Sequence, residues 1–270
     1  MGRILSAEQV RRYDREGFLF PIDVLSANEV ARLCSAFGET MRYLCGDHSP
    51  EARSGLHLHC RWLYDLALYP SILDVIEDIL GPEFLVLSTI VFFKPPRDDH
   101  FVSWHQDGRF ISRTDNGSPS ALTAWVALTE STIQNGNLRV IPGSQRAGRV
   151  AHTDTYARDN LLRRGETVEG LFDENSAVDI LLRAGQMSLH HVDTIHGSSP
   201  NRSGADRVGV AIRFIHPRLN LIRNDAPVVK ARGCGQYKHH QFLPQPPEDD
   251  IAKGVAAHLD AIRRSSRAST

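Results

Sequence analysis

The chain changes character at residues 81–82, a Gly-Pro pair that separates helix-like sequence from strand-like sequence. After this pair, residues 84–93 are rich in β-branched and aromatic side chains, a composition typical of a buried β-strand. Before it, residues 71–80 carry isoleucine and valine at helical spacing, which predicts a helix that stops at the glycine. We therefore expect a helical N-terminal layer, about residues 6–82, followed by a β-rich core.

Two earlier helices are predicted by the residues at their N-terminal ends. Ser6 and Ser26 each precede helix-forming residues, and Glu29, three residues after Ser26, completes a capping box. Near the other end of the chain, a short helix is expected over residues 251–259, with residues 263–270 frayed.

The remainder of the core reads as short strands separated by turn residues. The strands are expected at residues 84–93, 103–106, 121–129, 138–141, 187–191 and 208–215. Asn-Gly, Pro-Gly and Ala-Gly pairs punctuate this sequence, and many short strands with such turns favour a jelly roll over about residues 84–217. The charged, weakly periodic residues 145–180 predict a partly helical, lid-like insertion, all within a single domain of residues 1–270.

The composition limits the classes of partner. Lys plus Arg is 31 and Asp plus Glu is 32, so the basic excess of a nucleic-acid-binding protein is missing. The sequence contains no apolar run able to span a bilayer and no signal-peptide core. Four cysteines without paired spacing favour a reduced, cytoplasmic setting. The expected partner is a small-molecule substrate rather than nucleic acid or a membrane, and the oligomeric state stays open.

A His-x-Asp pair within Trp-His-Gln-Asp-Gly, residues 104–108, carries the main chemical signal. Side chains alternate along a strand, so His105 and Asp107 should point to the same side and reach one ion. His196, which follows a strand-like segment, is the best candidate for a third ligand. Two imidazoles and one carboxylate leave three octahedral positions open, as in iron(II) oxygenases, where a bidentate 2-oxo acid and O₂ can bind.

A second cluster begins eleven residues after His196, at Arg207. In the strand expected there, Arg207, Gly209 and Ala211 should share one face, which sets an arginine beside two minimal side chains. This pattern indicates a charged anchor facing a cavity, and a guanidinium can pair with the far carboxyl group of a dicarboxylate through two hydrogen bonds. A surface ion pair is the alternative role for the arginine.

Five short runs follow one another in a fixed order along the chain. They are Phe-Lys-Pro-Pro at 93–96, Trp-His-Gln-Asp-Gly at 104–108, Thr-Ala-Trp at 123–125, Asn-Gly-Asn-Leu-Arg-Val-Ile-Pro-Gly-Ser at 135–144, and His-Gly-Ser-Ser-Pro-Asn at 196–201 with Arg207 beyond it. Together they resemble the phytanoyl-CoA dioxygenase (PhyH) family of iron(II)- and 2-oxoglutarate-dependent oxygenases, over roughly residues 10–235. The resemblance implies a double-stranded β-helix, or jelly roll, with iron held by His105, Asp107 and His196.

The resemblance also implies a cosubstrate site. Arg207 would bind the 2-oxoglutarate carboxylate that lies farther from the metal, helped by the hydroxyl of Ser198. Trp125 matches a tryptophan near the cosubstrate in relatives, although a packing role explains it equally well. Ser88 falls where some relatives place a polar cosubstrate contact.

The expected reaction is hydroxylation of a small polar molecule, in secondary-metabolite tailoring or small-molecule catabolism, with release of succinate and CO₂. Halogenating members of this group carry a small residue in place of the metal carboxylate, so the presence of Asp107 favours hydroxylation. Desaturation or cyclisation by the same iron chemistry is an alternative. A cupin-like metal-binding sensor without turnover is a second alternative, and a zinc hydrolase is a third.

Two further arginines are candidates for substrate binding. Arg109 directly follows the His-x-Asp run, and Arg213 should share the face of Arg207. Either guanidinium would suit a carboxylate, phosphonate or phosphate on the substrate, with a solvated or ion-paired arginine as the plain alternative.

Other histidines are given lesser roles. His57, His59 and Cys60 lie close together, but packing is favoured over a second metal site. Of His190 and His191, one should face the interior of the barrel and the other the opposite side. His191 is the alternative third ligand.

Overall fold

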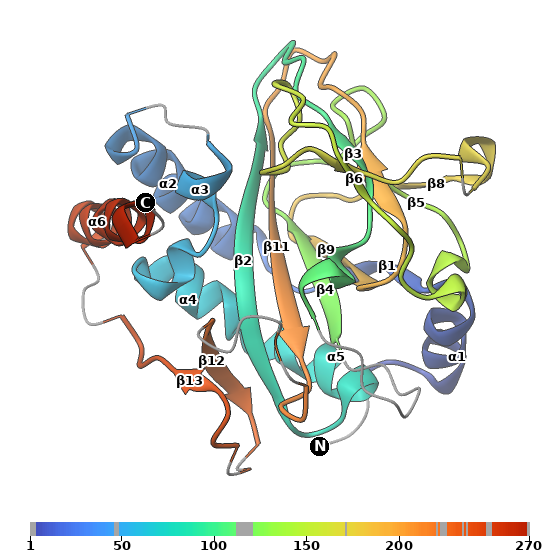
Figure 1. The fold of residues 1–270 in the computed structure, drawn as a ribbon, viewed down its shortest axis with the longest axis horizontal. Coiled ribbons are helices and arrows are strands. Elements are labelled where there is room, and N and C mark those ends of the chain that lie inside the picture. The colour runs from blue at the N-terminus through green and yellow to red at the C-terminus, as the bar shows by residue number, and fades with distance from the viewer. Residues whose placement is uncertain are drawn as a thin grey trace.

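The computed structural model describes residues 4–45, 49–111, 121–170, 172–219, 221, 226–233, 235, 237–246 and 250–268, without the side chains of residues 109, 110 and 265–268. Two facing sheets form its centre (Figure 1). The larger has the order β1 (Phe18–Asp23), β9 (Gln186–His191), β4 (Ala121–Ala127), β11 (Arg207–Ile215), β2 (Phe84–Lys94), β12 (Pro227–Arg232) and β13 (Gln241–Phe242). The smaller has the order β3 (Val102–His105), β10 (His196–Ser198), β5 (Leu138–Val140) and β8 (Val178–Ile180). Nearly all neighbouring strands pair antiparallel, which confirms the predicted jelly roll.

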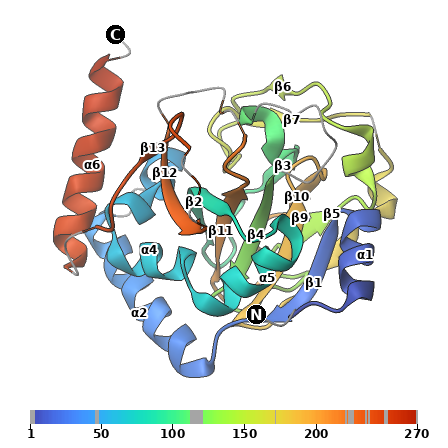
Figure 2. The ribbon, with the colours of Figure 1, turned by 90° about the horizontal axis from the view of Figure 1, so that it is seen from below.

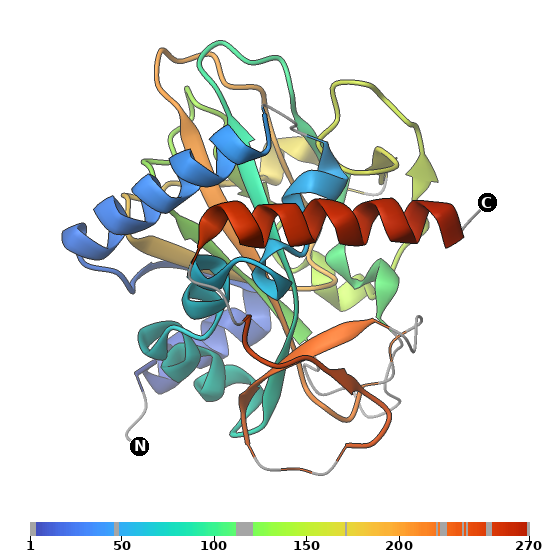
Figure 3. The same ribbon diagram turned by 90° about the vertical axis from the view of Figure 1, so that its left-hand side faces the viewer.

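Helices cover the outer face of the larger sheet, on the side away from the smaller one (Figures 1 and 2). They are α2 (Ala27–Tyr43), α3 (Pro50–Arg53), η1 (Leu56–Leu58), α4 (Arg61–Ala67), α5 (Pro70–Leu80) and α6 (Ile251–Ala268). Helix α6 lies across the outside of this layer (Figure 3). A separate helix, α1 (Ala7–Glu16), precedes β1. The N-cap predicted at Ser6 and the capping box predicted at Ser26 are both present, and Ser6 forms a capping box with Gln9 as well.

Strand β11 shows how the sequence separates the protein core from the site. Its apolar residues at alternate positions, Val208, Val210, Ile212 and Phe214, belong to the large hydrophobic cluster shared with the helical layer. Its remaining residues face the smaller sheet, and Arg207, Ala211 and Arg213 among them line a cavity there. The predicted common face of Arg207, Gly209 and Ala211 thus turns inward, toward the second sheet.

Several elements differ from the expectations. Strand β1 was not predicted because it contains Pro21, which a sheet tolerates only at its edge, where β1 lies. Strand β10 is only three residues long, too short to give a periodic signal. Helix α6 continues to Ala268 instead of fraying at 263, and its residue His258 is buried, with Nε2 donating to the carbonyl of Ala52 in α3.

The segment from 145 to 180 crosses the opening between the sheets. It contains two 3₁₀ helices, η3 (Ser144–Ala147) and η4 (Glu174–Ser176), and the strand pair β6 (Thr153–Asp154) and β7 (Glu166–Thr167). The buried guanidinium of Arg53 ties it to the larger sheet, since it donates to the carbonyls of both Leu161 and Val91. Among the helices that the structure describes, none has the length and apolar character needed to cross a membrane.

Candidate metal centre

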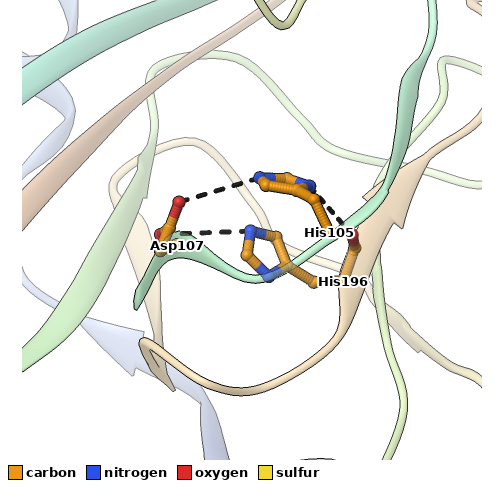
Figure 4. Close-up of side chains that lie close together, drawn as sticks. All are labelled: His105, Asp107 and His196. Atoms are coloured by element: carbon orange, nitrogen blue, oxygen red, sulfur yellow. Dashed lines mark hydrogen bonds and ion pairs between the residues drawn. The ribbon is translucent and has the colours of Figure 1, made fainter. Parts of the chain in front are cut away.

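Three buried side chains converge between the sheets (Figure 4). His105 ends β3, His196 begins β10, and these two residues are direct partners in the antiparallel pair of strands. Asp107 opens the short helix η2 (Asp107–Phe110). Its Oδ1 lies 3.7 Å from His105 Nε2 and its Oδ2 lies 4.0 Å from His196 Nε2. All three candidate ligand atoms lie within 4.8 Å of one another, close enough to share one ion.

Asp107 reaches the site from a turn and not from the strand that was expected to carry it. The ladder of β3 ends at His105, but Gln106 keeps an extended backbone, with φ −120° and ψ 133°. The alternation of side chains therefore continues for two residues beyond the strand. Gln106 points away from the site, and its amide group donates to the carbonyls of Gly148 and Asp193.

Hydrogen bonds orient both imidazoles toward the carboxylate. The Nδ1 of His105 lies 2.9 Å from the carbonyl of Ser103 and 3.1 Å from the carbonyl of His196. The Nδ1 of His196 lies 2.9 Å from the carbonyl of Thr194. Since a carbonyl only accepts, each Nδ1 carries the proton, and each Nε2 keeps its lone pair for a metal.

The charges of the cluster suit a divalent cation. Burial would raise the pKa of the Asp107 carboxyl, but the guanidinium of Arg213 and contacts from the neighbouring histidines hold that pKa well below its usual range. Burial and the adjacent His105 and His190 lower the pKa of His196 well below its usual value. The site thus presents an ionised carboxylate and neutral imidazole, the donor set of a non-haem iron(II) centre.

A cavity extends from the three side chains toward Arg207. Arg207 is buried, its Nε and Nη2 donate to the carbonyl of Gly136, and its Nη1 has no hydrogen-bond partner. The guanidinium lies over the indole of Trp125, 5.1 Å from the ring centre. Burial lowers the pKa of Arg207 to about 10, because the buried guanidinium is poorly solvated.

Lys94 is a second buried basic residue beside Arg207, and no local pattern in the sequence predicted a role for it. It is fully buried and is the direct neighbour of Arg207 across β2 and β11. Its Nζ donates to the hydroxyl of Ser198 at 2.7 Å and to the carbonyl of Ser199 at 2.5 Å. Burial, reinforced by Arg207, holds its pKa well below the usual value. Neither cation is paired with a carboxylate in the described part of the chain, so the pair forms a site for an anion.

A second, outer chamber lies next to the first cavity and shares Phe92, His105, Asp107 and Arg213 with it. Its outer wall comes from α3 and from the segment 145–180, with Pro50, Glu51, Leu161, Leu162, Arg163 and Glu166. His105 and Asp107 therefore line both chambers, and His196 lines the inner one.

The structure assigns different surroundings to the remaining candidates near the site. Trp125 and Ser198 line the inner cavity. Arg213 donates to Oδ1 of Asp107 and, through Nη1 at 3.3 Å, to the hydroxyl of Ser88, which is not among the lining residues. The side chain of Arg109 lies outside the described residues.

The other histidines separate into those inside the barrel and those outside it. His190 faces the interior, as expected for one of the pair, and lines the inner cavity. His191 accepts from the backbone N–H of Asp193 and does not line that cavity. His57 is buried against Thr89, 3.0 Å from its hydroxyl. Among the described residues, His105, Asp107 and His196 are the only group of histidine, cysteine and carboxylate side chains placed to share one metal ion.

Known proteins share both the sequence and the fold. The family profile described as phytanoyl-CoA dioxygenase (PhyH) matches residues 13–209. A probable alpha-ketoglutarate-dependent hypophosphite dioxygenase of Stutzerimonas stutzeri is 28% identical over 228 residues, 82% of this chain and 71% of that protein. An L-proline trans-4-hydroxylase of Streptomyces griseoviridis is 26% identical over 249 residues, 81% of this chain and 93% of that protein. The solved structure of the non-heme monooxygenase ThoJ in its apo form has a TM-score of 0.80 at 30% identity, covering 96% of each chain.

These similarities agree with the fold and with the chemistry of the cluster. The relatives are dioxygenases, hydroxylases and a monooxygenase, and the family match covers most of the chain. The two imidazoles and the carboxylate fit iron(II), and the inner cavity offers cations for an oxo acid. The chain belongs to the phytanoyl-CoA dioxygenase family and is an iron(II)- and 2-oxoglutarate-dependent oxygenase.

Proposed function

We propose that this enzyme hydroxylates a small polar molecule and holds iron(II) with His105, Asp107 and His196. The observation that carries the proposal is that His105 and Asp107 line two neighbouring chambers, of which the inner one is also lined by His196 and the buried Arg207. Bound iron would supply the redox chemistry by which O₂, 2-oxoglutarate and a C–H bond of the substrate give succinate, CO₂ and a hydroxylated product. The protein positions the reactants and excludes water from them.

The inner cavity suits 2-oxoglutarate. Arg207 and Lys94 would neutralise the carboxylate farther from the metal, which relieves the cost of burying two cations. Because Ser198 accepts a hydrogen bond from Lys94, its own hydroxyl proton is free to be donated to that carboxylate. The indole of Trp125 would form one wall of the site.

The outer chamber is the proposed substrate site, and its charges bear on the choice of substrate. Glu51 and Arg163 form an ion pair of 2.7 Å at its rim, and Arg213 is committed to Asp107. Glu166 is buried, accepts a hydrogen bond from the backbone N–H of Arg164, and has no cationic partner among the described side chains. A buried carboxylate without a cation beside it favours a substrate with a cationic or hydrogen-bond-donating group, such as an amine.

The reaction is proposed to take place in a reducing, cytoplasmic setting. Cys34, Cys45 and Cys60 are all free thiols, which supports this proposal.

Anaerobic visible absorption tests the proposed site. Adding Fe(II) and then 2-oxoglutarate should give a weak charge-transfer band, because the oxo acid chelates the metal. His105→Ala should abolish the band, and Arg207→Gln should require at least about tenfold more 2-oxoglutarate, since a bidentate charged contact is lost. Arg202→Gln, which changes an exposed arginine paired with Asp99, is the matched control and should behave like the wild type.

The outcomes separate the candidate functions. A band followed by succinate formation in air supports an oxygenase, and a screen of amines against neutral analogues then identifies the substrate. If iron binds but no band forms, chelation of the oxo acid is wrong. The metal-binding sensor then becomes the better description.

A further inference from the structure

A row of polar side chains crosses the larger sheet beneath the candidate metal centre. The pairing of β9, β4, β11 and β2 sets His190 opposite Thr123, Thr123 opposite Arg213, and Arg213 opposite Ser88. Directly paired residues of antiparallel strands point to the same face, so these four side chains form one line. The line meets the carboxylate of Asp107, which comes from outside this sheet, and three of its four members contact that group.

The contacts divide between the two carboxylate oxygens. The hydroxyl of Thr123 donates to Oδ2 at 2.5 Å, and the Nε2 of His190 lies 3.4 Å from the same oxygen. The guanidinium of Arg213 donates to Oδ1. Contacts to both oxygens fix the orientation in which the carboxylate can meet a metal ion.

Among these four residues, His190 stands apart because its imidazole forms no hydrogen bond. Its side chain is 2% exposed, and neither ring nitrogen has a hydrogen-bond partner. A buried polar group without partners destabilises a fold, so a histidine at this position calls for a reason other than packing. The nearest charged group is the carboxylate of Asp107.

A role as a fourth metal ligand does not explain it. The ring of His190 lies 4.4 Å from that of His196, yet its nitrogens are not part of the group of ligand atoms that lie within 4.8 Å of one another. His190 therefore acts through Asp107 and not on the ion directly.

We propose that His190 is a positioning residue for the proposed metal ligand Asp107, its Nε2 set against Oδ2 so that the carboxylate is held in one orientation. The inference rests on the proposed function, since it takes Asp107 as a ligand. Together with Thr123, His190 fixes the orientation of the carboxylate before the ion arrives, which lowers the cost of ordering the site on metal binding.

Metal affinity tests this role without relying on turnover. The dissociation constant for Co(II) is measured by competition with a fluorescent chelator, and thermal unfolding of the metal-free protein is measured in parallel. His190→Leu should weaken Co(II) binding by about 10- to 100-fold. The unfolding temperature should be as high as in the wild type or higher, because a poorly bonded imidazole is replaced by an apolar side chain. His190→Gln keeps an N–H donor and should recover part of the affinity.

Ser188→Ala is the matched control. Ser188 lies on the same strand and the same face as His190, and it is also buried with an unpartnered hydroxyl, but it does not contact Asp107. Its variant should bind Co(II) like the wild type. His105→Ala should lose the metal, and if it does not, the proposed metal site itself is wrong.

Two results would overturn the role of His190 while leaving the metal site intact. One is a Leu variant that binds Co(II) within about twofold of the wild type. The other is a loss of Co(II) affinity in His190→Leu that is no larger than the loss in Ser188→Ala, or that is accompanied by a lower unfolding temperature. Either result would mean that the substitution weakens binding by disturbing the packing. If His190→Leu does not fold, His190→Gln is the variant that tests the proposal. A Co(II) affinity of His190→Gln equal to that of Ser188→Ala would count against it.

Discussion

The guanidinium of Arg213 donates to Oδ1 of Asp107, so the carboxylate of the candidate metal cluster is paired with a cation. The Arg213 side chain is mostly buried and the Asp107 side chain is almost fully so. A carboxylate buried to this extent would otherwise lose its ionisation, and the ion pair keeps it charged. Arg213 thus holds the proposed ligand in the ionised form that a divalent cation needs.

Replacing Arg213 should make the stability of the protein depend on metal. Arg213→Gln leaves Asp107 as a buried charge with a weaker partner, and the metal-free protein should lose roughly 3 kcal/mol of unfolding free energy. Added Co(II) should restore much of that loss, because it binds the folded state alone. Thermal unfolding with and without Co(II) measures both effects. Equal stabilisation by Co(II) in the variant and the wild type would contradict this account.

Lys94 should contribute to cosubstrate binding as strongly as Arg207. Lys94→Met removes one of the two buried cations and frees the hydroxyl of Ser198 from its orienting donor. The concentration of 2-oxoglutarate needed for half-saturation should rise about 10-fold or more, as expected for loss of a charge-assisted contact. Fe(II) affinity should stay close to that of the wild type, since Lys94 does not line the cavity at the metal ligands. A parallel loss of Fe(II) binding would point instead to a general disturbance of the site.

Gly209 should be intolerant of any side chain because of Trp125. A Cβ built at Gly209 would lie 2.0 Å from Cζ2 of the indole, far inside van der Waals contact. Gly209→Ala must therefore displace the indole from beneath Arg207, at a cost of about 1–3 kcal/mol. The expected signs are a lower unfolding temperature and weaker 2-oxoglutarate binding, both measurable by thermal shift. Gly204→Ala, where nothing lies within 4 Å of the added Cβ, is the control.

Acid should destabilise the helical layer through two buried histidines. Burial, together with neighbouring histidines, lowers the pKa of His57 to about 3 and that of His258 to about 4. Because both pKa values lie below the unfolded value of about 6.5, the stabilisation is complete above pH 6.5. It is lost as the pH falls through the folded values, and for His258 the loss is on the order of 3 kcal/mol.

Denaturant unfolding between pH 7 and pH 4 checks this expectation. In His258→Gln the slope of stability against pH should be shallower, while the amide can still donate to the carbonyl of Ala52. A slope identical to that of the wild type would show that protonation of His258 does not contribute.

The sequence alone predicted the parts of the site that depend on local spacing. His105 and Asp107 are two residues apart in extended backbone, and the inward face of Arg207, Gly209 and Ala211 follows from strand alternation. The helix caps at Ser6 and Ser26 were predicted for the same reason, since a cap is defined within a few residues.

The sequence did not reveal contacts that depend on register between distant strands. From the sequence, Lys94 is simply the last residue of an apolar strand. Only the pairing of β2 with β11 places it beside Arg207. In the same way, the alignment of His190 with Thr123 requires the register of β9 and β4, which no local pattern specifies. The pairing of Arg213 with Asp107 likewise joins segments 106 residues apart.

The alternation along β11 also has a consequence for how such an enzyme can change over generations. Val208, Val210, Ile212 and Phe214 pack into the core shared with the helical layer, while Arg207, Ala211 and Arg213 line the cavity. A lineage can therefore alter the cavity at alternate positions of this strand while the core-facing side chains stay the same.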